Sequence, residues 1–128
     1  MIYFVCGLIG AGKTTWAKKH FQTVTDADEE RSKTEQIRKT LTLSEHGDVA
    51  HITCYPTEEE RMVFPDAKWI WIDTDPVRAM TNIMTRGRVT DMVDLPHVRN
   101  KNEMLYVKLA SCRHPIRRIT VFSDNERW

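Results

Sequence analysis

One segment near the N-terminus has the residue types and the spacing needed to hold a phosphate chain. Residues 7–14 read Gly-Leu-Ile-Gly-Ala-Gly-Lys-Thr and satisfy the pattern G-x-x-x-x-G-K-[S/T] in full. Glycines let the backbone turn its N–H groups inward and approach phosphates without a Cβ atom in the way. In such a loop the lysine reaches the β- and γ-phosphates and the hydroxyl that follows ligates Mg²⁺. We expect a nucleotide to be bound by Gly7, Gly10, Ala11, Gly12, Lys13, Thr14 and Thr15, with Thr14 as the metal ligand.

Two further groups of charged residues lie where a phosphotransfer reaction needs them. Asp28 and Arg31 follow the second expected strand, three residues apart on one face of a helix start. The carboxylate could accept a proton from an attacking hydroxyl, and the arginine could hold an anionic group of the acceptor. The same acidic stretch is also what the first turn of an ordinary helix favours.

Arg86 and Arg88 flank Gly87 in a connection between two expected helices. There they fit a lid that folds over a bound triphosphate, spanning about residues 85–96. They also fit a basic helix end capped by glycine, which needs no ligand.

Hydrophobic patterning predicts alternating strands and helices around these groups. Short apolar runs rich in β-forming residues predict strands over residues 2–6, 24–25, 49–54, 68–72 and 119–122. Helical spacing and cap signals, among them Thr57 with Glu60 three residues later, predict helices over 13–21, 32–41, 57–64, 77–85 and 96–111. This alternation predicts a three-layer α/β fold, in which a five-stranded, mostly parallel sheet is covered by helices on both faces.

Length and composition fit one compact domain over residues 1–128. No stretch approaches the roughly 18 apolar residues that a membrane span requires, and the first apolar run is too short for a signal peptide. We therefore expect a cytoplasmic protein without a membrane partner. The cysteines are odd in number and widely spaced, so we expect small buried hydrophobic residues rather than a disulfide framework or a metal site at Cys6, Cys54 and Cys112.

The net charge is only +1, but its distribution along the chain is uneven. Residues 1–75 hold 9 Lys and Arg against 13 Asp and Glu (net −4), whereas residues 76–128 hold 10 against 5 (net +5). A positive second half favours an anionic substrate. An ordinary mixed surface would also show a difference of this size.

The order of these features resembles the kinase domain of the phage-type polynucleotide 5′-hydroxyl kinases and their small P-loop relatives. Those proteins begin with a strand, the pattern G-x-x-G-x-G-K-[S/T]-T-W-A and a helix, and residues 7–17 match that run. They place D-x-x-R after the second strand, as Asp28 and Arg31 stand here. Near the end they carry an arginine-glycine lid followed by a proline and a helix, as at Arg86 and Pro96. The resemblance spans almost the whole chain and is strongest in its first 20 residues.

The resemblance implies a three-layer P-loop kinase fold, ATP and Mg²⁺ as cofactors, and a role for each matching residue. Lys13 and Thr14 would serve ATP and Mg²⁺. Asp28 would be the general base, Arg31 would contact a phosphate of the acceptor, and Arg86 would stabilise the transferred charge.

This sequence departs from the family pattern in a short second helical segment and at two residue positions, all of which bear on the acceptor. The loop after the third strand reads Thr-Cys-Tyr-Pro at residues 53–56, where the family usually has an aspartate. Asn82 stands four residues before Arg86, where the lid often has another arginine, a part that Arg88 could take. Tyr55 could stack on a base of the acceptor or serve only in packing. Asp73 could lie near Mg²⁺ or belong to a helix start.

Together these observations predict a phosphotransferase that moves the γ-phosphate of ATP to a hydroxyl of a nucleic acid, on a polynucleotide or on a modified base. Two alternatives stay open. One is a nucleoside or nucleotide monophosphate kinase, with a nucleotide as acceptor. The other, from a different class, is a nucleotide-binding module that acts through partners.

Overall fold

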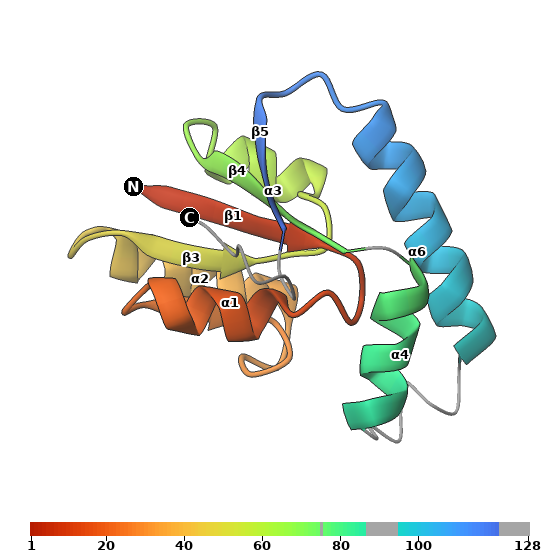
Figure 1. Ribbon diagram of the computed structural model, residues 1–128. Coiled ribbons are helices and arrows are strands. Elements are labelled where there is room, and N and C mark those ends of the chain that lie inside the picture. Colours follow the sequence, from red (N-terminus) through yellow and green to blue (C-terminus); the bar gives the residue numbers. More distant parts are fainter. Residues whose placement is uncertain (75, 87–94, 121–128) are drawn as a thin grey trace.

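The protein is described from a computed structural model, in which strands and helices alternate along the chain (Figure 1). Residues 1–74, 76–86 and 95–120 are described, with residues 76, 85 and 86 by their backbone alone. The strands are β1 (Ile2–Gly7), β2 (Val24–Asp26), β3 (Val49–Ile52), β4 (Lys68–Asp73) and β5 (Ile116–Thr120). The helices are α1 (Lys13–His20), α2 (Lys33–Ser44), α3 (Glu58–Val63), α4 (Pro76–Arg86) and α6 (Leu95–Ala110).

The five strands form one parallel sheet in the order β2-β3-β1-β4-β5. In the central strand β1, Phe4 pairs with His51 of β3 on one side and with Trp69 of β4 on the other. Its residues Phe4, Val5 and Cys6 are fully buried, as expected for a parallel strand that is covered on both faces. The predicted α/β fold is confirmed, and the sheet is parallel throughout.

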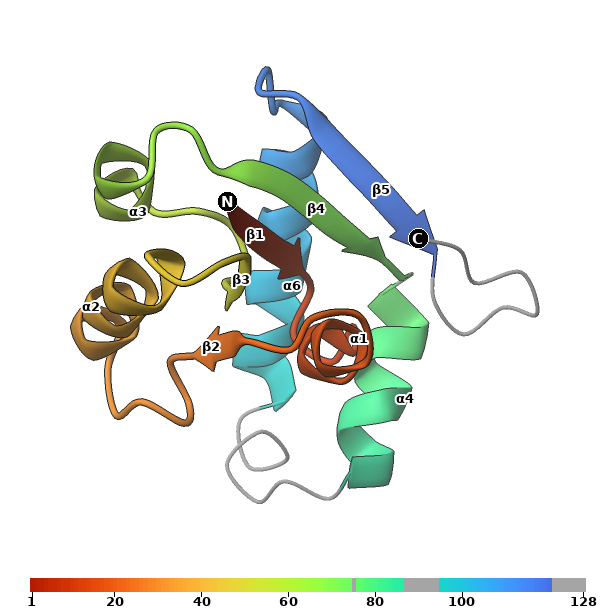
Figure 2. The ribbon, with the colours of Figure 1, turned by 90° about the vertical axis from the view of Figure 1, so that its left-hand side faces the viewer.

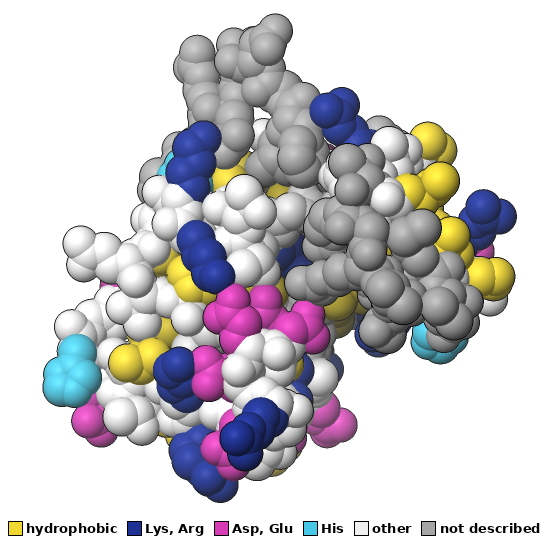
Figure 3. All heavy atoms as spheres, turned by 90° about the horizontal axis from the view of Figure 1, so that it is seen from below, with side chains coloured by type: hydrophobic (Ala, Val, Ile, Leu, Met, Phe, Trp, Pro, Cys, Tyr) yellow, Lys and Arg dark blue, Asp and Glu magenta, His cyan; other side chains and the backbone are white. Residues whose placement is uncertain are grey.

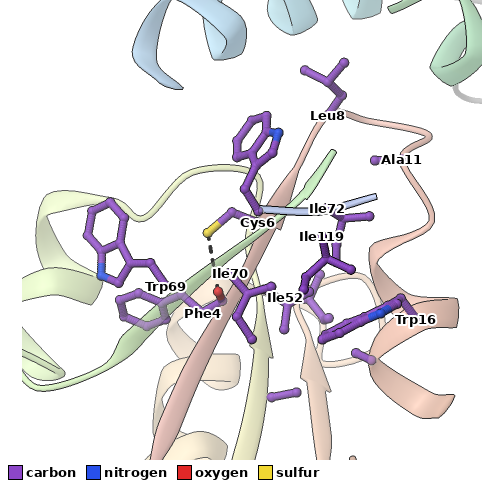
Figure 4. Packing of buried hydrophobic residues seen from close by; sticks show 14 of the residues in the cluster. Phe4, Cys6, Leu8, Ala11, Trp16, Ile52, Trp69, Ile70, Ile72 and Ile119 are labelled. Atoms are coloured by element: carbon purple, nitrogen blue, oxygen red, sulfur yellow. Dashed lines mark hydrogen bonds between the residues drawn. The ribbon is translucent and has the colours of Figure 1, made fainter. Parts of the chain in front are cut away.

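Alternate residues of the strands build two separate apolar layers. Phe4 turns toward α3, where its ring lies 6.1 Å from that of Phe64, whereas Trp16 of α1 packs on the opposite face (Figure 4). Figure 2 shows the same division, with α1 on one side of the sheet and α2 and α3 on the other. Helices α4 and α6 contact each other and run near the carboxyl ends of the strands (Figure 1).

The order of the strands fixes where a ligand can enter. The connection from β1 to β2 passes β3 along the face that α1 covers, and the connection from β3 to β4 passes β1 along the face that α3 covers. Beyond β1 and β3 the chain therefore turns to opposite faces and leaves a crevice between them. In parallel α/β sheets, ligands bind in such a crevice at the carboxyl ends of the strands.

Most element boundaries lie within two residues of those predicted from sequence, and β5 and α2 show the larger differences. Strand β5 begins at Ile116, three residues before the predicted start, and its pairing with β4 places Ile119 against the core and leaves Arg117 and Arg118 exposed. Residues 121 and 122 of the predicted strand lie outside the described residues. Two consecutive exposed arginines hide this strand from a search for alternating apolar residues. Helix α2 extends to Ser44, three residues past the predicted end. Among the described helices, none is both long and apolar enough to cross a membrane.

Candidate active site

A cavity of about 570 Å³ opens at the crevice between the carboxyl ends of the strands. It is bordered by the glycine loop, the start of α1, the loop after β2, the start of α2, the end of β3 and one residue of α6. Its lining residues are Ile9, Gly10, Gly12, Lys13, Thr14, Thr15, Lys18, Asp26, Ala27, Asp28, Glu29, Lys33, Ile52, Thr53, Cys54 and Lys101. The topology of the sheet and the location of the phosphate-loop motif thus point to the same place.

The glycine loop between β1 and α1 has the backbone that its sequence predicts. Gly10 and Gly12 take φ angles of 87° and 86°, in the left-handed region that favours glycine. A Cβ atom at Gly10 would also collide with the carbonyl oxygen of Ala79 in α4. Lys13 Nζ lies within the loop and donates to the carbonyl oxygens of Leu8 at 2.7 Å and Gly7 at 3.2 Å. The first helical turn and the lysine therefore converge on one small volume, which suits a polyphosphate.

Two asparagines, on helices α4 and α6, form hydrogen bonds with the backbone of the glycine loop. Asn102 of α6 is buried, accepts a hydrogen bond from Ile9 N at 2.8 Å and donates to Ile9 O at 3.1 Å. Asn82 of α4 donates to the carbonyl oxygen of Gly10 at 2.9 Å. The position where the family's lid often has an arginine therefore serves here to fix the loop. Sequence reasoning missed this role of both residues, because an amide inside a helix carries no signal of a partner about 70 to 90 residues away.

Asp26, the last residue of β2, is the acidic group that sequence reasoning missed. Its Oδ2 accepts a hydrogen bond from the Thr14 hydroxyl at 2.7 Å, and its Oδ1 accepts from the backbone N–H of Asp28 at 3.1 Å. The side chain is largely buried between α1 and the loop after β2. The available signal was a carboxylate placed directly after a buried strand, at the edge of the sheet where the glycine loop also lies.

The loop after β2 brings Asp28 to the cavity but leaves Arg31 outside its lining. Asp28 is exposed and stands two residues beyond Asp26. Arg31 is exposed too, with a φ angle of 73°. Glu29 lines the cavity as well and pairs with Lys18 of α1 at 2.8 Å. The predicted pair of Asp28 and Arg31 is therefore divided, with the carboxylate inside the site and the guanidinium not among the residues that border it.

The remaining predicted residues fall into two groups. Arg88 and most of the predicted lid, about residues 85–96, lie outside the described residues, as does the side chain of Arg86. Tyr55 is not among the residues that line the cavity, and its ring packs edge-on against Trp69 with the centroids 5.6 Å apart. Burial and, to a smaller extent, a hydrogen bond with Cys112 raise the pKa of Tyr55 to about 12, so the phenol stays neutral at physiological pH.

Asp73 forms an ion pair between two strands, and the three cysteines differ in their burial. Arg118 of β5 donates to both carboxylate oxygens of Asp73, at 3.0 and 3.1 Å, which ties the ends of β4 and β5 together. Cys6 is buried, as expected. Cys54 and Cys112 are only half-buried, and Cys54 borders the cavity.

Behind the cavity, a buried polar cluster joins β2, α2, β3 and α3. Glu60 of α3 is fully buried, and its carboxylate accepts hydrogen bonds from His51 Nε2, the Thr53 hydroxyl, the Thr57 backbone N–H and Lys33 Nζ. On the other side of the imidazole, His51 Nδ1 lies 2.7 Å from the hydroxyl of Thr40. Four donors to one carboxylate show how a buried negative charge is held in this layer of the core.

The electrostatics of Glu60 follow from those partners. Burial by itself raises the pKa of Glu60, but hydrogen bonds from His51 and the backbone of Thr57, with the positive charge of Lys33, lower it from 4.5 to about 2. The carboxylate is therefore ionised at neutral pH. Since an ionised carboxylate only accepts hydrogen bonds, His51 Nε2 is the donor in its bond to Glu60.

The surface over α1 and α2 carries both signs of charge. Seen from below, acidic and basic side chains lie interspersed, with no broad field of one sign (Figure 3). The cavity lining repeats the pattern, because it contains both lysines and carboxylates: Lys13, Lys18, Lys33 and Lys101 together with Asp26, Asp28 and Glu29. Recognition of an anion at this site would therefore depend on individual lysines rather than on a general positive potential.

Comparisons with known proteins establish the fold. No protein-family model and no curated protein matches the sequence. An uncharacterized protein from Eubacterium ventriosum ATCC 27560 matches in structure with 16% identity, a TM-score of 0.59 and coverage of 94% of this chain and 88% of that one. A deoxyadenosine kinase from M. mycoides with bound dATP matches at 13% identity, TM-score 0.57, with 97% and 93% covered. A gluconokinase from Sinorhizobium meliloti 1021 matches at 12% identity, TM-score 0.53, with 94% and 82% covered. The chain therefore shares its α/β fold with these two kinases.

The depressed pKa of Glu60 predicts an acid-dependent loss of stability. Its contribution is present above pH 4.5, the ordinary value, and is lost as the pH falls toward 2, because the folded state must then bind a proton that it resists. A shift of this size corresponds to a loss of about 3 kcal/mol in the free energy of unfolding. Urea unfolding between pH 7 and pH 2.5 should show this loss in the wild type and a much weaker one in Glu60→Gln. Glu59→Gln, at an exposed position of α3, is the control. Equal acid dependence in all three proteins would contradict the assignment.

Proposed function

We propose that this protein is an ATP- and Mg²⁺-dependent phosphotransferase that phosphorylates a hydroxyl group of a nucleic acid. The observation that carries the proposal is the cavity itself, because the glycine loop with Lys13 shares it with the carboxylates at the end of β2. One side of the cavity suits a triphosphate and the other offers a base to an acceptor. A transfer reaction needs both in one space.

Thr14 and Asp26 would hold the magnesium ion. Their oxygen atoms are 2.7 Å apart at the start of α1, and hydroxyl and carboxylate oxygens are the hard ligands that Mg²⁺ accepts. A bound Mg²⁺ would offset the charge on the phosphate oxygens during transfer. The residues present therefore fit the ion, and Asp26 joins Thr14 as a ligand.

The other residues of the cavity divide the chemistry between them. The N–H groups of the loop and Lys13 would bind the phosphates and stabilise the negative charge that develops on the transferring group. Asp28 would take the proton of the acceptor hydroxyl while the hydroxyl oxygen attacks the γ-phosphorus and ADP leaves. Exposure at the mouth of the cavity suits Asp28 for this role, since the hydroxyl must arrive from solvent.

Several features support a nucleic acid as acceptor. The order of motifs resembles that of the polynucleotide 5′-hydroxyl kinases, and the cavity presents Lys33 and Lys101 beside the carboxylates. A nucleoside or nucleotide monophosphate is the second candidate, and the structural likeness to a deoxyadenosine kinase favours it. The two candidates differ in whether the acceptor is a strand with a sugar-phosphate backbone or a single nucleoside or nucleotide.

Replacing Lys13 by alanine should abolish phosphotransfer and leave the fold intact. The lysine side chain is confined to the loop, so its loss removes charge stabilisation without opening the core. Turnover and circular dichroism would be measured together, with Lys68→Ala, an exposed lysine at the start of β4, as the control. A tenfold loss of rate corresponds to an increase of only about 1.4 kcal/mol in the activation barrier. Activity of the variant within that range of the wild type would exclude the assigned role.

Asp28→Asn and Asp26→Asn should have different kinetic effects. Loss of a general base lowers turnover by about 10²–10⁴-fold, so Asp28→Asn should reduce kcat with little change in the KM for ATP. Asp26→Asn should instead raise the Mg²⁺ concentration needed for half-maximal activity. Titrations with Mg²⁺ and with ATP on both variants separate the roles. A normal kcat in Asp28→Asn would refute the base.

The salt dependence of the KM for the acceptor should distinguish the two candidate acceptors. Each phosphate contact by a lysine or arginine releases counterions, so log KM for a single-stranded oligonucleotide should change with log salt by about 0.7 per contact. We expect the oligonucleotide to be a better acceptor than the matching mononucleotide at low salt and to lose this advantage as salt rises. An acceptor screen with labelled ATP tests this. Equal use of a nucleoside monophosphate without a salt effect would favour the small-molecule kinase.

A further inference from the structure

Lys33, the first residue of α2, is a cation held at the wall of the cavity by two buried groups. Its Nζ lies 3.3 Å from Glu60 Oε2 and 3.3 Å from the hydroxyl of Thr53. Its side chain is one-third exposed (33%), whereas that of Glu60 is fully buried (0%), and Lys33 itself lines the cavity. One end of this ion pair therefore lies in the core and the other faces the site.

The contact with Glu60 fixes the position of the ammonium group of Lys33, although Glu60 has other partners that stabilise its negative charge. Glu60 already accepts hydrogen bonds from His51, Thr53 and the backbone of Thr57, so its charge is well supported without Lys33. An ammonium group has three N–H donors, and the bonds to Glu60 and Thr53 use two of them. The third can serve a ligand in the cavity.

The position of Lys33 also suits an anion on the acceptor side of the cavity. It stands in the first turn of α2, where the amide dipoles add positive potential, and follows the loop that carries Asp28. The cavity is bordered near it by Thr53 and Cys54 at the end of β3, and the hydrogen bonds of Lys33 go to Thr53 and Glu60 rather than to the glycine loop. Arg31, expected from sequence to bind the acceptor's phosphate, does not line the cavity.

We propose that Lys33 binds a phosphate group of the acceptor, with Glu60 and Thr53 as the positioning residues that hold its ammonium group. The inference rests on the phosphotransferase function proposed above and adds a specificity to it. The site would prefer an acceptor that carries a phosphate near the reacting hydroxyl, such as an internal phosphate of an oligonucleotide or the phosphate of a nucleotide. A neutral nucleoside would gain nothing from Lys33.

A purely structural ion pair between α2 and α3 would respond differently to substitution. Lys33→Met would then lower the melting temperature and leave the binding of acceptors unchanged. Under the proposal, Lys33→Met weakens phosphate-bearing acceptors selectively, and Lys33→Arg, which keeps the positive charge, restores part of the loss. Lys39→Met is the matched control, because Lys39 lies on the same helix, is exposed and pairs with Glu30 at 2.6 Å.

The kinetic test compares acceptor and donor constants in the wild type, Lys33→Met, Lys33→Arg and Lys39→Met. For a single-stranded oligonucleotide with a free 5′-hydroxyl, we expect the KM to rise about tenfold or more in Lys33→Met, the size of one lost charge-assisted contact. The KM for ATP should stay within about twofold, since Lys33 is held by Glu60 and Thr53 and makes no hydrogen bond to the described residues of the glycine loop. The log–log salt slope should fall by about 0.7, one phosphate contact. An unchanged acceptor KM and salt slope in Lys33→Met would overturn the proposal.

A binding test separates this proposal from the proposed reaction. Fluorescence anisotropy with a dye-labelled oligonucleotide, competed by a nucleoside monophosphate or by the parent nucleoside, needs no turnover. If the wild type transfers phosphate to no acceptor but binds the oligonucleotide more tightly than Lys33→Met does, the phosphotransferase function fails and the phosphate site stands. Equal binding by both proteins, or equal competition by nucleoside and nucleotide, would overturn the role of Lys33.

Discussion

The burial of β1 on both faces is the constraint on which the rest of the structure depends. This strand forms the middle of the sheet, and its apolar residues contribute to both layers of the core. A strand in that position cannot shift by one residue without moving its large side chains to the wrong layer. The glycine loop begins where the strand ends, so the register of β1 also fixes the place at which a phosphate chain would bind.

The loop gains its rigidity from contacts that are distant in sequence. Asn102 and Asn82 hold Ile9 and Gly10 through their backbone groups, and α4 approaches so closely that only glycine fits at position 10. On the opposite side, Thr14 is joined to β2 through Asp26. A loop supported on both sides presents its N–H groups in a fixed geometry, which is the condition for electrostatic stabilisation without reorganisation.

The layer behind the acceptor side combines apolar packing with a network of buried polar contacts. Gln36 of α2 donates to the carbonyl oxygens of Thr25 and Ile52, and so bridges the carboxyl ends of β2 and β3. His51 and Glu60 continue the network to α3. Buried polar groups that are hydrogen-bonded to one another specify one arrangement of the elements more strictly than apolar contacts do. The elements that border the cavity therefore have a defined spacing, which an acceptor site requires.

The sequence by itself determined the class of fold, the phosphate loop and the capping box of α3. These features depend on residues close together in the chain: the run of apolar residues in β1, the glycine spacing up to Lys13, and Thr57 with Glu60. The position of Asp28 at the cavity also followed from its place in the sequence, two residues after a strand that ends at the crevice.

Only the tertiary structure decided which residues border the site. Asp26 reaches Thr14 because α1 crosses over to β2, and Lys33 becomes a cavity residue because Glu60, on a helix that follows the next strand, draws its ammonium group inward. Tyr55 packs against Trp69 because β3 ends beside that layer of the core. Strand order and the pairing of buried polar groups depend on contacts between segments far apart in the chain, and the pattern of residues in any one segment carries no information about them.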